Sequence, residues 1–349
     1  MIPDTVLEKI RVDEVEPSAW LAAWAEKLLG FKDEPGYWHH MCRDYFDRCC
    51  QVVGLDEQAP VEVDQKDTIL PSGKAISSLG AAQCTWQGSR TAKFIQGIHK
   101  AIVDLRKRFP KEKLRILYAG TGPLAPLALP LLAYMGCEKL DFVCLDIHET
   151  SLKRAQKLAK HFGVEEGISE WVCGDAATFS PPDGHSGYHM IISEVMQQAL
   201  QNEPQVAVTI NLSQFLVEGG SFIPERVLLS LQHYDIGSRM NATLNGGGDI
   251  ALFTQHIADV FELTADTALT WKTFQKRIPA AKVQMSPSTM PKSEPYIFTD
   301  IQVYGSIWLK AYECSLNLPV RLNDINFDDS EIEFYYEMGQ IPNLKLLKS

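Results

Sequence analysis

Large apolar residues recur at helical spacing near the start of the chain: Trp20, Leu21, Trp24 and Leu28. This spacing predicts an amphipathic helix that ends at Gly30, because glycine commonly ends a helix. A second helix is predicted over residues 37–53. The polar stretch 55–74 contains two prolines and a glycine, which is typical of a linker. Residues 1–75 are therefore expected to form a helical N-terminal region.

The pattern changes from about residue 89 to short apolar runs that alternate with helical segments. Strands are predicted at 114–119, 140–145, 169–173 and 188–193, and helices at 91–108, 151–162 and 205–216. Strands that alternate with helices of this length predict a parallel sheet with helices on both faces. Residues 76–222 are thus expected to form an α/β domain of the Rossmann-like kind.

Beyond about residue 223 the alternation stops. The segments 227–236, 295–313 and 331–338 are rich in β-branched and aromatic residues, and a polar, glycine-containing insertion occupies 241–249. These features predict a mostly antiparallel β domain over residues 223–349.

Composition narrows the classes of function. The 349 residues are 45% hydrophobic, which suits two or three folded domains and excludes general disorder. The 33 Lys and Arg residues against 44 Asp and Glu residues argue against nucleic-acid binding, because phosphate contacts need clustered cations. The longest apolar run, 124–135, is too short to span a bilayer, and the charged start is unlike a signal peptide. Eight cysteines without a Cys-x-x-Cys pair favour a cytoplasmic protein.

A glycine turn follows the first predicted strand of the α/β domain. Gly120, Thr121 and Gly122 form this turn, and Asp146 ends the next strand 26 residues after Gly120. Glycines allow the backbone to approach a ligand closely, and an acid at the second strand can accept the hydroxyls of a ribose. The arrangement suits a nicotinamide dinucleotide or S-adenosylmethionine. A glycine turn of any doubly wound domain, with Asp146 capping a helix, is the simpler alternative.

A further acidic position after the third strand favours S-adenosylmethionine. Asp175 and Ala176 follow that strand, and an Asp at this place can hold the adenine amino group in adenosylmethionine enzymes of this fold. We therefore expect Asp175 and Ala176 to join the glycine turn and Asp146 in binding S-adenosylmethionine as cofactor.

Two acidic residues lie nine positions apart after the fourth predicted strand. The segment runs from Ile191 to Glu203, with Glu194 after Ile-Ile-Ser and with Met196 and Leu200 between the acids. It resembles the double-glutamate loop of the protein arginine methyltransferase family, which has the form IISE-x-M-x-x-x-L-x-x-E. Without this pattern, a helix-capping acid and a solvated acid would be the simpler interpretation.

Two further segments carry the same resemblance. Residues 216–226 are similar to the family's L-x-P-x-G-x-x-x-P-x-R segment, which enters its β-barrel, with Glu218 in place of the first proline. Arg90, followed by Thr91, is similar to the family's arginine that pairs with the methionine carboxylate of the cofactor. The resemblance covers about residues 88–230.

The resemblance implies a class I S-adenosylmethionine-dependent methyltransferase that acts as a homodimer. In that family Glu194 and Glu203 would hold the guanidinium as catalytic residues, and Arg90 would contact the cofactor. The sequence departs from the family at Tyr118, in place of the first glycine of its turn, and at Ile116, in place of an acid. The β domain also has no Thr-His-Trp segment. These departures fit bacterial relatives that methylate free arginine better than enzymes of peptidyl arginine.

The chemistry of a paired-carboxylate site can be stated independently. A guanidinium is planar, carries five N–H donors and stays protonated at neutral pH. Two carboxylates can accept paired N–H bonds from it and draw its charge toward the bonded nitrogens. The remaining nitrogen then attacks the methyl donor, and a glutamate takes the released proton. The reaction needs neither a metal nor a covalent intermediate.

Other interpretations remain open at this level. The chain could methylate peptidyl arginine, or could transfer another group from S-adenosylmethionine, since its GTGPL turn also resembles nicotianamine synthases. A scaffold without catalysis is a third possibility. No metal site is predicted at His39, His40 and Cys42, because adjacent helical side chains point about 100° apart. The tryptophans of the N-terminal region are expected in a core or a subunit contact, and the basic cluster 106–113 at a solvated helix end.

Overall fold

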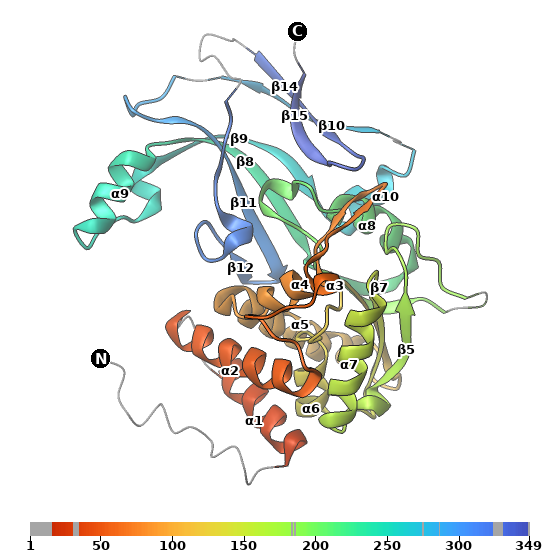
Figure 1. Ribbon diagram of the computed structural model, residues 1–349. Helices are drawn as coiled ribbons and strands as arrows, with labels where there is room; N and C mark the ends of the chain where they lie inside the picture. The colour runs from red at the N-terminus through yellow and green to blue at the C-terminus, as the bar shows by residue number, and fades with distance from the viewer. Residues whose placement is uncertain are drawn as a thin grey trace.

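A computed structural model describes residues 16–30, 35–182, 184, 186–273, 276–285, 287–323 and 331–347. An α/β core and an antiparallel β region lie next to each other, and the N-terminal helices pack against the core (Figure 1). All eight cysteines are free.

The core contains one parallel five-stranded sheet in the order β5-β4-β3-β6-β7. Its strands are β3 (Leu114–Ala119), β4 (Leu140–Asp146), β5 (Ile168–Cys173), β6 (Tyr188–Ser193) and β7 (Leu216–Ile223). Every residue of β6 is buried, and so are most residues of β3 and β4. Burial on both faces explains why these strands are almost continuously apolar. The predicted Rossmann-like arrangement is therefore present.

The order of the strands defines where a ligand would bind. From β3 the chain moves outward through β4 and β5, and it then returns to β6 on the other side of β3. In open α/β sheets, ligands bind beyond the carboxyl ends of the strands at this change of direction. Gly120 follows β3 and Glu194 follows β6, so both lie at this point of the sheet.

Helices cover the sheet and extend into the N-terminal region. They are α1 (Pro17–Gly30), α2 (Pro35–Val53), α3 (Glu62–Gln65), α4 (Ser78–Cys84), α5 (Gly88–Arg108), α6 (Leu129–Met135), α7 (Glu149–His161) and α8 (Gln205–Leu212). Helix α1 packs on α6, and α2 packs on α5. Trp20, Trp24 and Trp38 are buried, and the Trp24 indole N–H donates to the carbonyl of Met41 at 2.9 Å. The tryptophans thus belong to the core.

The C-terminal region is antiparallel throughout its described strands. One sheet has the order β12-β11-β8-β9, with β13 also pairing with β11, and a second has the order β10-β14-β15. The strands are β8 (Arg226–Tyr234), β9 (Thr254–Leu263), β10 (Arg277–Gln284), β11 (Glu294–Tyr304), β12 (Ile307–Leu309), β13 (Val320–Arg321), β14 (Glu331–Glu337) and β15 (Asn343–Leu347). Two helices, α9 (Ile236–Leu244) and α10 (Ala265–Thr270), connect them.

Three local predictions differ from the structure. The expected linker contains a hairpin of β1 (Thr68–Leu70) and β2 (Gly73–Ala75). The predicted helix 205–216 ends at Leu212, and the residues from Leu216 form strand β7 at the edge of the sheet. The polar insertion begins inside α9, which has no buried residue. Edge strands and exposed helices leave weak patterns because little of them is buried.

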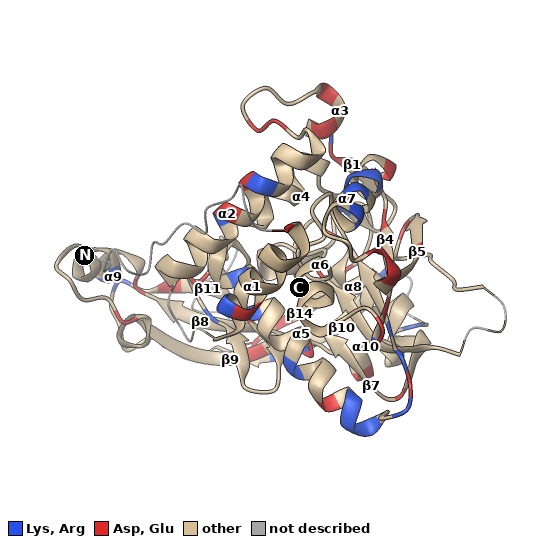
Figure 2. Cartoon of the chain, turned by 90° about the horizontal axis from the view of Figure 1, so that it is seen from below, with Lys and Arg blue, Asp and Glu red and all other residues tan. Residues whose placement is uncertain are grey.

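Charged side chains are distributed over several elements (Figure 2). Lys and Arg gather at the C-terminal end of α5, where Lys107, Arg108, Lys111 and Lys113 are exposed. This agrees with a solvated helix end. No helix in the described part of the chain is both long and apolar enough to cross a membrane.

Candidate active site

One cavity lies beyond the carboxyl ends of β3, β4, β5 and β6. The space between its walls, including the part open to solvent, is about 1030 Å³. All nine residues predicted from the sequence line it: Arg90, Gly120, Thr121, Gly122, Asp146, Asp175, Ala176, Glu194 and Glu203.

The glycine turn after β3 leaves no room for side chains. Gly120 has φ +81°, and a Cβ atom there would lie 2.6 Å from Cγ1 of Val195 and 3.0 Å from the carbonyl oxygen of Glu194. Gly122 has φ +64°, which also favours glycine. The hydroxyl of Thr121 donates to the carbonyl of Tyr118 at 3.0 Å and fixes the turn. The backbone can therefore approach a ligand in the cavity.

Asp146 connects this turn to the start of α7. Its Oδ2 accepts a hydrogen bond from the amide of Gly122, and its Oδ1 accepts one from the amide of His148, both at 2.8 Å. Burial raises the pKa of Asp146, while these two bonds oppose the increase. His148, not Asp146, is the N-cap of α7, and Asp146 bonds the amide of this residue rather than an amide of the helix. A carboxylate has about four acceptor positions, so two remain for a ligand.

Asp175 and Ala176 form the turn after β5. The Oδ1 atom of Asp175 accepts from the amide of Ala177 at 2.8 Å, and the carbonyl of Ala176 accepts from the side-chain amide of Asn211 at 2.9 Å. These bonds hold the turn against α8, with both residues on the cavity wall.

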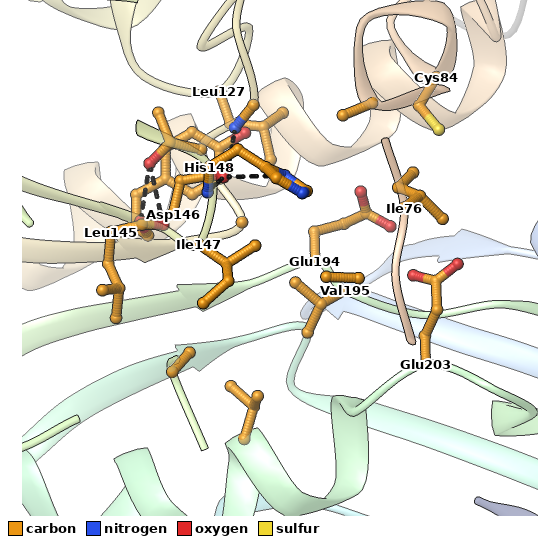
Figure 3. A pocket seen from close by; sticks show the side chains of 18 of the residues that line it. Ile76, Cys84, Leu127, Leu145, Asp146, Ile147, His148, Glu194, Val195 and Glu203 are labelled. Atoms are coloured by element: carbon orange, nitrogen blue, oxygen red, sulfur yellow. Dashed lines mark hydrogen bonds and ion pairs between the residues drawn. The ribbon is translucent and has the colours of Figure 1, made fainter. Parts of the chain in front are cut away.

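Glu194 and Glu203 direct their carboxylates into the same space (Figure 3). Both oxygens of Glu194 accept from Nη2 of Arg90, at 2.5 and 2.6 Å. Arg90 lies in the first turn of α5 and is only 6% exposed. Burial raises the pKa of Glu194, and the neighbouring guanidinium counteracts this. Glu194 is therefore a charge-compensated carboxylate.

Glu203 has no such partner. It is 5% exposed, and no Lys, Arg or His among the described residues forms an ion pair with it. Burial, together with the charge of Glu194, raises the pKa of Glu203 from 4.5 to about 7. A buried carboxylate without a cation is costly, and such groups are concentrated at functional sites. Arg90 is therefore paired with one of the two glutamates and not with the other.

The loop between the two acids has an unusual backbone. Ala199, Leu200 and Asn202 have φ values of 54°, 54° and 62°, which are left-handed and strained for residues other than glycine. Residues of the C-terminal strands hold this loop. The amide of Ala199 donates to the hydroxyl oxygen of Thr299 at 2.9 Å, and the hydroxyl of Tyr336 donates to the carbonyl of Leu200 at 2.7 Å. The β region therefore fixes the position of Glu203.

The β1–β2 hairpin forms part of the cavity wall. The amide of Lys74 donates to the carbonyl of Asn202 at 2.6 Å. A Cβ atom on Gly73 would lie 2.8 Å from the backbone nitrogen of Pro204, so only glycine fits this contact. At the other end of the hairpin, the hydroxyl of Thr68 and Nε2 of His148 are 3.1 Å apart. The hairpin thus spans from the start of α7 to the loop that carries Glu203.

The chain resembles solved structures of other proteins in its fold. No protein-family model and no curated protein sequence matches the chain. A solved structure similar to it is the Trypanosoma brucei PRMT1 enzyme-prozyme heterotetrameric complex with AdoHcy. The two share 13% sequence identity and a TM-score of 0.47, over 75% of this chain and 90% of that chain. A functional assignment has to rest on the geometry of the cavity instead.

Sequence reasoning missed several residues of the cavity wall. Lys74, Ile76, Cys84 and His148 line it, and Ile76 lies beside the two acids (Figure 3). His148 could have been suspected from its position two residues after Asp146. Lys74 comes from the supposed linker, Ile76 follows β2, and Cys84 ends α4, and no local pattern signals a site in these segments. Among the described residues, no group of three or more His, Cys, Asp or Glu side chains is placed to hold a metal ion.

Tyr336→Phe tests whether the β region holds the acidic loop. The change removes the one side-chain donor that the described residues offer to the buried carbonyl of Leu200, and leaving a buried acceptor unpaired costs about 1–3 kcal/mol. We expect a melting temperature lower by several degrees and a kcat/KM about tenfold lower. Tyr335→Phe is the matched control, since Tyr335 points to the other face of β14, against Arg277. Equal effects of the two changes would contradict this role.

Proposed function

We propose that the protein transfers a methyl group from S-adenosylmethionine to a guanidino nitrogen of free arginine or a similar small molecule. The observation that carries this proposal is the buried Glu203, unpaired by any described cation, beside Glu194 in a cavity that also contains the glycine turn and Asp146. A cationic, planar substrate with several N–H donors would satisfy both acids at once.

The residues present fit S-adenosylmethionine. Gly120 and Gly122 place backbone atoms without side chains on the cavity wall, and Asp146 retains acceptor positions for ribose hydroxyls. We assign Asp175 and Ala176 to the adenine side, and Arg90 to the methionine carboxylate. When bound, S-adenosylmethionine supplies an electrophilic methyl group on a sulfonium, and its sulfur keeps the electron pair of the broken C–S bond.

The chain's own residues bind the acceptor and move a proton. Glu194 already faces Arg90, so it offers its remaining lone pairs to the guanidinium while staying ionised. Glu203 supplies the second charge, and a bound cation would lower its pKa, which favours the carboxylate form. These bonds draw positive charge away from the attacking nitrogen. As the N–C bond forms, that nitrogen must lose a proton, and Glu203 accepts it.

A direct assay tests the proposal. Purified protein is mixed with methyl-labelled S-adenosylmethionine and free arginine, and the products are separated by chromatography. We expect labelled methylarginine and adenosylhomocysteine. Methylthioadenosine as by-product would indicate an aminopropyl-type transferase instead. Label on arginine-containing peptides but not on free arginine would indicate a protein methyltransferase, and calorimetry without adenosylmethionine binding would indicate a scaffold.

The pKa of Glu203 predicts the pH dependence. Because the base must be ionised and its pKa is about 7 in the empty site, kcat/KM should increase as the pH rises through 7 and then level off. In the complex the guanidinium lowers this pKa, so the rise in kcat should occur at lower pH. Initial rates from pH 5.5 to 9 measure both profiles. If the pH profiles of kcat and kcat/KM coincide and neither increases near pH 7, Glu203 is not the proton acceptor.

We also propose a homodimer in the cytoplasm. Helix α9 has no buried residue, and its apolar side chains Met240 and Leu244 are exposed, which leaves a surface that a second copy could cover. The eight free cysteines are compatible with a reducing compartment. Light scattering of the purified protein tests the dimer, and a monomeric mass would refute it.

A further inference from the structure

Lys74 is a cation in the cavity that the proposed chemistry does not use. Among the described Lys and Arg residues, Lys74 and Arg90 line this cavity. Both hydrogen bonds of Arg90 to the acidic pair go to Glu194. Lys74 belongs to β2, in a part of the chain whose sequence suggests only a linker. Its presence beside the acidic pair needs an explanation.

The backbone of Lys74 is fixed to the loop that carries Glu203. Its amide donates to Asn202, and Gly73 packs against Pro204 without space for a Cβ atom. The position of residue 74 is therefore set by backbone contacts on both sides of Glu203. The charge of Lys74 reaches this acid, since it lowers the pKa of Glu203 against the larger effects of burial and of Glu194.

Asp67 orients the ammonium group. Nζ of Lys74 lies 3.1 Å from Oδ2 of Asp67, whose Oδ1 accepts from the amide of Ser77 at 2.8 Å. An ammonium has three N–H donors, so donors remain after the pair with Asp67. The side chain of Lys74 is 29% exposed. It can therefore contact a ligand that enters the cavity.

We propose that Lys74 binds the carboxylate of the acceptor and makes the enzyme selective for guanidino acids. This rests on the proposed function. Free arginine carries a guanidinium at one end for Glu194 and Glu203, and a carboxylate at the other end for Lys74. An arginine inside a peptide has no such carboxylate. A charge-assisted bond of this kind provides specificity as well as affinity, because an analogue without the carboxylate cannot make this bond to the Lys74 ammonium.

Paired substrates and variants test this role. The substrates are L-arginine and agmatine, which is arginine without its carboxylate. The wild-type protein should have a KM for agmatine about 10- to 100-fold above that for arginine. Rates are compared at pH 9, where Glu203 should be ionised with or without the charge of Lys74. There Lys74→Met should raise the KM for arginine by a similar factor, and it should change kcat and the KM for agmatine much less. Lys74→Arg should retain most of the preference, and Lys66→Met, at an exposed position of the same segment, should behave as the wild type.

Binding measurements separate this role from its alternatives. Calorimetry with arginine, in the presence of adenosylhomocysteine, needs no turnover. If arginine binds through Lys74 but is not methylated, the proposed reaction is wrong and the carboxylate site stands. If Lys74→Met weakens the binding of adenosylhomocysteine and not that of arginine, Lys74 contacts the cofactor and the inference is overturned. Equal KM values of the wild type for arginine and agmatine would also overturn the inference. The same holds if Lys74→Met raises the KM for both substrates by the same factor.

Discussion

Glu203→Gln should lower kcat/KM for guanidine methylation by at least about 100-fold and leave the binding of adenosylhomocysteine unchanged. Glutamine keeps the size of the side chain, but it removes the negative charge and the proton acceptor. The effect should be largest above pH 7, where the carboxylate of the wild type is ionised. The measurements are initial rates with labelled S-adenosylmethionine and calorimetry with adenosylhomocysteine.

Glu218→Gln is the matched control for this change. Glu218 is exposed on β7, so the same substitution there should alter neither rate nor binding. Glu194→Gln should also abolish methyl transfer, but it leaves Arg90 buried without its partner and should change cofactor affinity as well. Retention of methyl transfer by both Glu194→Gln and Glu203→Gln would show that the acids do not hold the substrate.

Glu203→Gln has a second expected effect, on stability. The pKa of Glu203 is raised on folding, so the folded state binds the proton more tightly than the unfolded state does. Stability should therefore fall as the pH rises from about 4.5 to 7, at up to about 1.4 kcal/mol for each unit of the pKa difference. Removing the charge avoids this loss. The variant should melt at a higher temperature than the wild type at pH 8 and at nearly the same temperature at pH 4.

Asp146→Asn should lower the affinity for adenosylhomocysteine by about 10- to 100-fold and reduce the melting temperature. The carboxylate accepts from two backbone amides, those of Gly122 and His148. An asparagine has one acceptor oxygen, so its NH₂ group would face the other amide. The glycine turn and the start of α7 would then separate. Calorimetry and thermal unfolding measure the two effects.

Asp141→Asn is the control at the opposite end of the same strand. Asp141 lies at the start of β4, near Arg115, and far along the strand from the cavity. It should affect cofactor binding little. If Asp146→Asn binds the cofactor as tightly as Asp141→Asn does, the ribose assignment is wrong and Asp146 only bonds the two backbone amides.

The strands of the core could be predicted closely from the sequence. The predicted strands 114–119 and 188–193 match β3 and β6, and the predicted helix 91–108 lies within α5. These elements bury most of their residues, so their sequences are constrained by packing and show a clear pattern. The β1–β2 hairpin, β7 and α9 were not predicted, because each is an edge or exposed element with polar or glycine residues.

The candidate site could be predicted as a set of residues but not as an arrangement. The nine residues were identified from three strand ends, one helix start and one acidic loop, and all of them line one cavity. Their chemical roles remain predictions. The bond between Arg90 and Glu194 joins residues 104 positions apart, and the contact of Gly73 with Pro204 joins two segments with separate local patterns. This contact places the neighbouring Lys74 on the cavity wall.

The sequence by itself determined the parallel core, the glycine turn, and the two acids that follow the fourth predicted strand, because local spacing and burial leave a periodic signal. Only the tertiary structure decided that Arg90 pairs with Glu194. It also left Glu203 without an ion pair to any described cation, which contributes to the raised pKa of this acid. The β1–β2 hairpin then places Lys74 in the same cavity. Charge compensation depends on which groups from distant parts of the chain come together in the folded protein. A local sequence pattern does not predict which of these distant groups lie close together.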